Sequence, residues 1–132
     1  METISVHASR DYEVRIGSGL LTRTGELSAP LIKGRHAIIV SDSNVWPLYG
    51  AMVQASLEDA GFQVDHFVFP AGEQSKNTDT LVQLLTCLAQ KGMTRSDGVF
   101  ALGGGVTGDL AGCFVQTCEL VMAICVWAAG KF

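Results

Sequence analysis

The chain has 132 residues, 48% of them hydrophobic, which is enough for one compact domain with its own core but too few for two. A formal net charge of -4 and a pI near 5.2 provide no basic surface for a phosphate backbone, so nucleic acid is excluded as the main partner. The charged N-terminus lacks an apolar signal segment and the four cysteines show no C-x-x-C spacing, so we expect a cytoplasmic location.

Two short β-type runs open the chain, at residues 4–8 and 12–16, and they predict a hairpin. After a short helical or irregular piece, the run 36–40 is continuously apolar and rich in β-branched residues. Such a run is typical of a strand buried on both faces of a parallel sheet. Apolar positions spaced by three and four then predict a helix over 45–60, with Gly61 as its end.

The second half of the chain repeats this alternation. Residues 64–69 predict a strand, and a leucine stripe over 81–88 predicts a helix that ends at Gly92. Residues 98–102 predict a further strand, which leads directly into three glycines. The alternation predicts an α/β fold, with a Rossmann-like parallel sheet and flanking helices preceded by the N-terminal β-hairpin. With three or four parallel strands, we expect an incomplete domain.

A ligand of such a sheet binds beyond the carboxyl ends of the strands, and three loops fall there. The first loop, residues 41–44, follows a buried strand and precedes a helix. The carboxylate of Asp42 could accept hydrogen bonds from an adenosine ribose, as the acidic residue of a dinucleotide fold does. The alternative is that Asp42 or Ser43 only caps the helix.

The second loop, residues 69–76, carries a carboxylate and an ammonium group three residues apart in front of a helix. Glu73 could hold a ribose hydroxyl while Lys76 faces a phosphate or a carboxamide. A solvated helix start capped by a serine explains the same pattern, so the loop alone does not decide between the two interpretations.

The third loop, residues 103–109, has the sequence GGGVTGD and matches the pattern G-x-G-x-x-G. Its glycines remove the Cβ atoms that would keep the backbone from a pyrophosphate, and they leave N–H groups free to bind it. The loop does not lie in the first strand-to-helix turn, and no acidic residue follows about 20 positions later, as the dinucleotide fingerprint requires. A structural tight turn is the alternative.

The apolar segment 110–129 raises the question of a membrane span. Gln116, Thr117 and Glu119 interrupt it, and a spanning helix needs about 20 mostly apolar residues. We therefore expect a buried segment, rather than a frayed tail or a membrane anchor.

Taken together, the three loops resemble the N-terminal domain of the 3-dehydroquinate synthase family of sugar-phosphate cyclases. The most specific matches are GEQSK at residues 72–76 and ALGGGVTGDLAG at residues 101–112. The opening, with VRIG at residues 14–17 and GLL at residues 19–21, resembles the first hairpin of that family. The resemblance covers residues 1–112, which we expect to form the NAD-binding domain.

The resemblance implies that the cofactor is NAD. It implies that Asp42 and Asn44 approach the adenosine end, and that Glu73 and Lys76 approach the ribose and neighbouring groups. It also implies that the third loop lines the pyrophosphate and ends with an aspartate beside the nicotinamide half. The expected cofactor-binding residues are Asp42, Asn44, Glu73, Lys76, Gly104, Gly105, Val106, Thr107, Gly108 and Asp109.

For an intact protein, the resemblance implies the conversion of a phosphorylated keto-acid, DAHP, into 3-dehydroquinate and phosphate, in the shikimate pathway of aromatic amino acid biosynthesis. It also implies a homodimer and a divalent metal, zinc or cobalt, held by a glutamate and two histidines of a following helical domain. Residues 113–132 depart from the family pattern, and we expect a divergent apolar tail without these ligands.

No catalytic or metal-binding residue is therefore expected in this chain. Its three histidines, His7, His36 and His66, have no second histidine or carboxylate at ligand spacing and are interpreted as core or surface residues. We expect a truncated family member that is inactive alone and binds NAD with a dissociation constant on the order of millimolar.

Two other classes of function stay open. One is a different sugar-phosphate cyclase, or a metal-dependent alcohol dehydrogenase of the same architecture. The other is a non-enzymatic module that binds a nucleotide or pairs with an intact subunit through an exposed sheet edge.

Overall fold

The computed structural model describes residues 2–7, 11–16, 19–94, 96–118 and 123–126. Strands and helices alternate from residue 36 onwards, after an N-terminal hairpin and a short helical segment. In chain order the elements are β1 (Glu2–His7), β2 (Asp11–Ile16), η1 (Leu20–Arg23), α1 (Thr24–Ser28), η2 (Ala29–Leu31), β3 (His36–Asp42), η3 (Trp46–Gly50), α2 (Ala51–Asp59), β4 (Gln63–Phe69), η4 (Glu73–Ser75), α3 (Thr78–Gln90), β5 (Gly98–Leu102), α4 (Gly105–Cys118) and β6 (Ala123–Val126).

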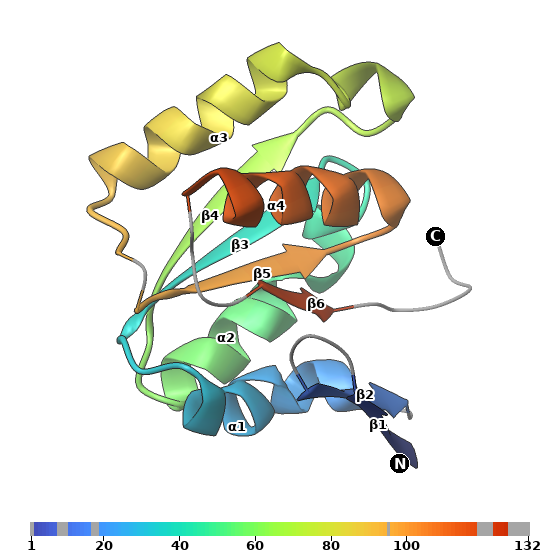
Figure 1. Ribbon diagram of the computed structural model, residues 1–132, viewed down its shortest axis with the longest axis vertical. Helices are drawn as coiled ribbons and strands as arrows, with labels where there is room; N and C mark the ends of the chain where they lie inside the picture. Colours follow the sequence, from blue (N-terminus) through green and yellow to red (C-terminus); the bar gives the residue numbers. More distant parts are fainter. Residues whose placement is uncertain (1, 8–10, 17–18, 95, 119–122, 127–132) are drawn as a thin grey trace.

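The centre of the molecule is a parallel sheet with the strand order β4-β3-β5-β6. Helices α3 and α4 cover one face of the sheet, while α1 and α2 lie on the other (Figure 1). Strands β1 and β2 form a separate antiparallel hairpin. The predicted α/β fold, a parallel sheet with flanking helices preceded by a hairpin, is thus confirmed.

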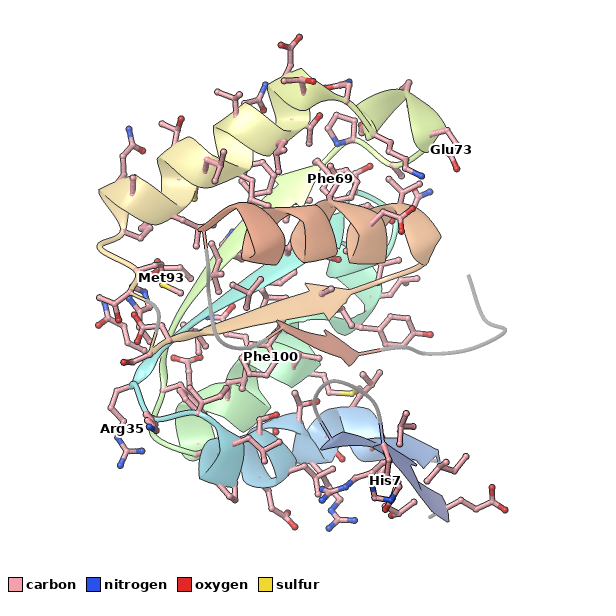
Figure 2. The ribbon with its side chains drawn as sticks, viewed as in Figure 1. His7, Arg35, Phe69, Glu73, Met93 and Phe100 are labelled. Atoms are coloured by element: carbon pink, nitrogen blue, oxygen red, sulfur yellow. The ribbon has the colours of Figure 1, made fainter. Side chains whose placement is uncertain are left out.

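Two hydrophobic cores explain why the apolar strands lie in the middle. Because successive side chains of a strand point to opposite faces, Ile38 and Val40 pack under α3 and α4, whereas Ala37 and Ile39 pack against α2. Figure 2 shows the same division for the aromatic side chains of β4 and β5, with Phe69 on the α3 and α4 side and Phe100 on the opposite side.

The helix predicted over residues 45–60 begins differently from the prediction. Residues 46–50 form a π-helical turn, and the α-helix starts only at Ala51. The side chain of Trp46 packs closely onto this turn, since a Cβ atom on Gly50 would lie 2.4 Å from its ring. The bulky indole therefore occupies the space above a residue that has no side chain. Pro47 lies in the first turn, as predicted, where a missing N–H costs little.

The C-terminal part of the apolar segment contains regular structure where it is described. Helix α4 runs to Cys118, and β6 pairs in parallel with β5. Residues 119–122 and 127–132 lie outside the described residues. No helix in the described part of the chain is both long enough and apolar enough to span a bilayer.

Candidate functional site

The three predicted loops converge at one edge of the sheet. In the parallel register Asp42 lies opposite Phe69 and Ser41 lies opposite Leu102, so β3, β4 and β5 end side by side. The chain moves from β3 to a neighbour on one side and then crosses to the other side to form β5. Such a reversal of strand order opens the crevice in which α/β sheets bind ligands. Figure 2 shows Glu73 at this edge, with Arg35 at the opposite edge.

Asp42 caps the turn that follows β3. Its Oδ1 accepts hydrogen bonds from the backbone N–H of Asn44 at 2.9 Å and of Val45 at 2.8 Å. The capping alternative is therefore observed. Within the described part of the chain Oδ2 of Asp42 has no hydrogen-bond partner, so one carboxylate oxygen orders the loop while the other is available to a ligand.

Ser43, to which the sequence assigned no role beyond capping, joins the first two loops. Its backbone N–H donates to the carbonyl of Phe69 at 2.9 Å, and its Oγ accepts from the N–H of Ala71, also at 2.9 Å. The loop after β3 is therefore tied directly to the loop after β4.

The second loop also forms hydrogen bonds within itself. Gln74 Nε2 donates to the carbonyl of Ala71 at 2.8 Å, and Asn77 Nδ2 donates to the carbonyl of Gln74 at 2.7 Å. The buried hydroxyl of Ser75 donates to the carbonyl of Pro70. The alternative of a serine cap is not observed, because Asn77 caps α3 by accepting the N–H of Thr80 at 2.9 Å.

The third loop leaves its backbone accessible. Gly103 has φ +153°, a conformation that favours glycine, and a Cβ atom there would lie 2.7 Å from Oγ1 of Thr107. By contrast, apart from the adjacent residues and the backbone of the helix itself, no described atom lies within 4 Å of a Cβ placed on Gly104 or Gly105. Because Gly105 begins α4, the first N–H groups of the helix point out of this open loop without intrahelical partners. The loop has the features of a backbone anion site.

Thr107 and Val106 turn their side chains inward. Thr107 is fully buried, and its Oγ1 has no hydrogen-bond partner among the described residues. An unsatisfied buried hydroxyl destabilises a protein, and this one lies directly beneath the glycine loop, 2.7 Å from the position that a Cβ atom on Gly103 would take. The partly buried side chain of Val106 packs against the core under α3 and α4.

An ion pair connects the second and third loops. Lys76 Nζ lies 2.8 Å from Oδ2 of Asp109, with the two side chains 48% and 58% exposed. The hydrogen bond and the charge of Asp109, together with the charge of Glu73, raise the pKa of Lys76 above its ordinary value. The carboxylate of Glu73 itself has no hydrogen-bond partner in the described part of the chain. The ion pair was not predicted, because its members lie 33 positions apart.

A second charged cluster lies at the opposite, amino edge of the sheet. Nε2 of His36 is hydrogen-bonded to Oδ2 of Asp65, and Nζ of Lys91 lies 3.5 Å from Oδ1 of the same carboxylate. The hydrogen bond from His36 is the main reason why the pKa of Asp65 is lowered. This contact was missed because the two residues lie on different strands. No group of three potential ligands able to hold a metal ion occurs among the described residues.

Comparison with known proteins adds independent information. Residues 66–122 match the family model for the N-terminal part of 3-dehydroquinate synthase. The chain is 49% identical over 106 residues to a 3-dehydroquinate synthase from Streptococcus suis, and 45% identical to one from Streptococcus pneumoniae. Each match covers 80% of this chain and 30% of the relative, so the chain spans about a third of the length of these proteins.

Solved structures show the same fold. A 2-deoxy-scyllo-inosose synthase in complex with carbaglucose-6-phosphate, NAD+ and Co2+ matches 95% of this chain and 34% of its own, with a TM-score of 0.84 and 24% identity. A 2-epi-5-epi-valiolone synthase from Streptomyces hygroscopicus with NAD+ and Zn2+ matches 94% of this chain and 33% of its own, with a TM-score of 0.71 and 24% identity. Fold and sequence thus agree: the chain is similar to the N-terminal part of 3-dehydroquinate synthases.

Proposed function

We propose that this chain binds NAD at the carboxyl edge of its sheet and supplies the dinucleotide-binding part of a 3-dehydroquinate synthase. The observation that carries the proposal is the convergence of three loops on one edge, with an open glycine loop at the start of α4 and a buried hydroxyl beneath it. Acidic side chains and a lysine surround this loop, which fits a ligand that carries both ribose hydroxyls and phosphates.

The proposed contacts follow the three loops. Asp42 and Asn44 face the adenosine end, and Glu73 and Lys76 face the ribose and the groups next to it. The backbone at Gly104 and Gly105, continued by Val106, Thr107 and Gly108, cradles the pyrophosphate, and Asp109 lies toward the nicotinamide. The two glycines fit this role because nothing described lies where their Cβ atoms would be.

NAD, when bound, supplies a hydride acceptor for a substrate hydroxyl group. The proposed activity of the whole protein is the conversion of DAHP into 3-dehydroquinate and phosphate. The 49% identity to a 3-dehydroquinate synthase favours this substrate over those of the other cyclases, since the 2-deoxy-scyllo-inosose synthase is only 24% identical. We propose a cytoplasmic location and, for the intact protein, a homodimer, which the family resemblance implies.

A divalent metal does not fit the residues described here, because they contain no group of three ligands. We therefore assign no step to a metal, and no catalytic residue to this chain. The expected outcome is that the 132-residue chain releases no phosphate from DAHP when assayed alone. Phosphate release above the buffer background would show that residues of this chain suffice for turnover.

Calorimetric titration of the chain with NAD+ tests the proposed binding, with an expected dissociation constant on the order of millimolar. Changing Gly105→Ala should weaken binding and Gly105→Val should abolish it, because each added carbon blocks the approach of the pyrophosphate to the backbone. Thermal melting of both variants should match the parent chain, since the space around this Cβ position is open. Unchanged NAD binding by the valine variant would rule out the phosphate-cradle role.

A further inference from the structure

The ion pair between Lys76 and Asp109 lies on the same helix face as the glycine loop. Asp109 follows Gly105 by four residues in α4, so the two positions lie one above the other on the helix surface. Side chains of a helix tilt toward its N-terminus, which directs the Asp109 carboxylate toward the loop. The ammonium group of Lys76, 2.8 Å from that carboxylate, is therefore held close to the open N–H groups at the start of α4.

We infer that Asp109 competes with the phosphates of the ligand for Lys76, so that the ion pair is an internal latch which must open when a diphosphate binds. This inference rests on the proposed function, and it adds that an acidic residue of the site weakens the binding of the anionic part of the ligand. The latch joins the loop after β4 to the helix after β5, the two elements between which the diphosphate has to enter.

The geometry suits an exchange of partners. Both side chains are about half exposed, and exposed ion pairs are weak, so the pair opens at small cost. The second loop is ordered by its own hydrogen bonds, such as those of Gln74 and Asn77, and does not depend on the ion pair for its shape. Lys76 can therefore leave Asp109 without loss of the fold around it. The negative charge of Glu73 adds to the field that holds the lysine in place.

Inorganic pyrophosphate is the probe that separates this competition from contacts to the rest of a dinucleotide. In calorimetric titrations of the full chain, Asp109→Asn should bind pyrophosphate about two- to fivefold more tightly than the parent chain, the range set by a weak exposed ion pair. Lys76→Met should weaken binding. In the double variant the gain from Asp109→Asn should vanish, because the lysine that it releases is absent.

Asp79→Asn provides the matched control for net charge. Asp79 is an exposed acidic residue in the first turn of α3, and its substitution changes the charge by the same amount without touching the ion pair. It should leave pyrophosphate binding unchanged. An equal gain in this control, or a gain from Asp109→Asn that persists without Lys76, would assign the effect to general charge and overturn the latch. Unchanged or weaker binding by Asp109→Asn would overturn it as well.

A second measurement needs no ligand. NMR titration of side-chain-labelled lysine should show that Asp109→Asn lowers the pKa of Lys76, because the carboxylate that stabilises the ammonium form is gone. An unchanged pKa of Lys76 would overturn the latch but would leave the proposed NAD binding untouched. Failure of the parent chain to bind both NAD+ and pyrophosphate, despite a lowered pKa in the variant, would instead overturn the proposed function together with the competition.

Discussion

At the amino edge of the sheet the polar side chains bind one another, whereas at the carboxyl edge several of them face solvent or lack a protein partner. Asp97, which precedes β5, accepts the backbone N–H of Thr94 at 2.8 Å and that of His36 at 3.3 Å, and it is buried. Thr107, at the other edge, is also buried but has no partner among the described residues. The polar groups at the amino edge therefore stabilise the domain, whereas several at the carboxyl edge are left without a protein partner among the described residues.

The largest expected difference in stability is between alanine substitutions of one glycine at each edge. A Cβ atom on Gly34 would lie 2.2 Å from Oδ1 of Asp97 and 2.8 Å from the carbonyl oxygen of Ser96. Gly34→Ala should therefore displace a buried, hydrogen-bonded carboxylate and lower the free energy of unfolding by about 2–4 kcal/mol. Chemical denaturation measures this value.

Gly104→Ala is the counterpart at the carboxyl edge. The space around this position is open, so the free energy of unfolding should change by no more than about 0.5 kcal/mol, while NAD binding should weaken at least about tenfold. Equal destabilisation by the two alanine variants would remove the distinction between the edges.

A smaller effect is expected from the amino-edge carboxylate. Asp65→Asn should destabilise the chain by about 1–2 kcal/mol at neutral pH, because it weakens the hydrogen bond from His36 and the ion pair with Lys91. The folded-state pKa of Asp65 is lowered, so its contribution is complete above the ordinary carboxyl pKa and is lost as the pH falls through the folded value.

Denaturation curves at several pH values should therefore show the difference between parent and variant shrinking below about pH 4. The exposed Asp59, at the end of α2, provides the control, and Asp59→Asn should leave stability nearly unchanged at every pH. A difference for Asp65→Asn that stayed constant into the acid range would contradict the assigned role of this carboxylate.

The smallest change in the free energy of unfolding is expected from replacing two buried threonines by valine, and it should have opposite signs at the two positions. Thr107→Val removes a hydroxyl that has no partner in the described part of the chain, and it should stabilise the ligand-free domain by about 1 kcal/mol. Thr24→Val removes a hydroxyl that donates to the carbonyl of Leu21 at 2.8 Å, and it should destabilise the domain by a similar amount. Destabilisation by both variants would show that the Thr107 hydroxyl is satisfied in the folded protein.

Sequence patterns predicted the fold well where a signal is local. The apolar run of β3 and the glycine that ends α2 report on their own surroundings, and both elements lie where they were expected, with β3 two residues longer than predicted. The start of α2 was less predictable, since the π-helical turn depends on how the indole of Trp46 packs over Gly50. Likewise, the sequence offers both Ser75 and Asn77 as caps for α3. In the structure Asn77 caps the helix and Ser75 is buried.

The candidate site was predictable as a set of loops but not as a network of contacts. Strand ends in a parallel sheet share one edge, so Asp42, Glu73 and the glycine loop could be grouped from the sequence. The ion pair between Lys76 and Asp109 could not be predicted from the sequence, because it depends on the relative placement of two elements that are distant in the chain. The sequence also gave no sign that the hydroxyl of Thr107 lies beneath Gly103 rather than at the surface.

The bridge formed by Ser43 has an evolutionary consequence. Because this one residue fixes both the carbonyl of Phe69 and the N–H of Ala71, an insertion or deletion in either connecting segment would pull the other out of alignment. We therefore expect the two segments to change in length together among related proteins.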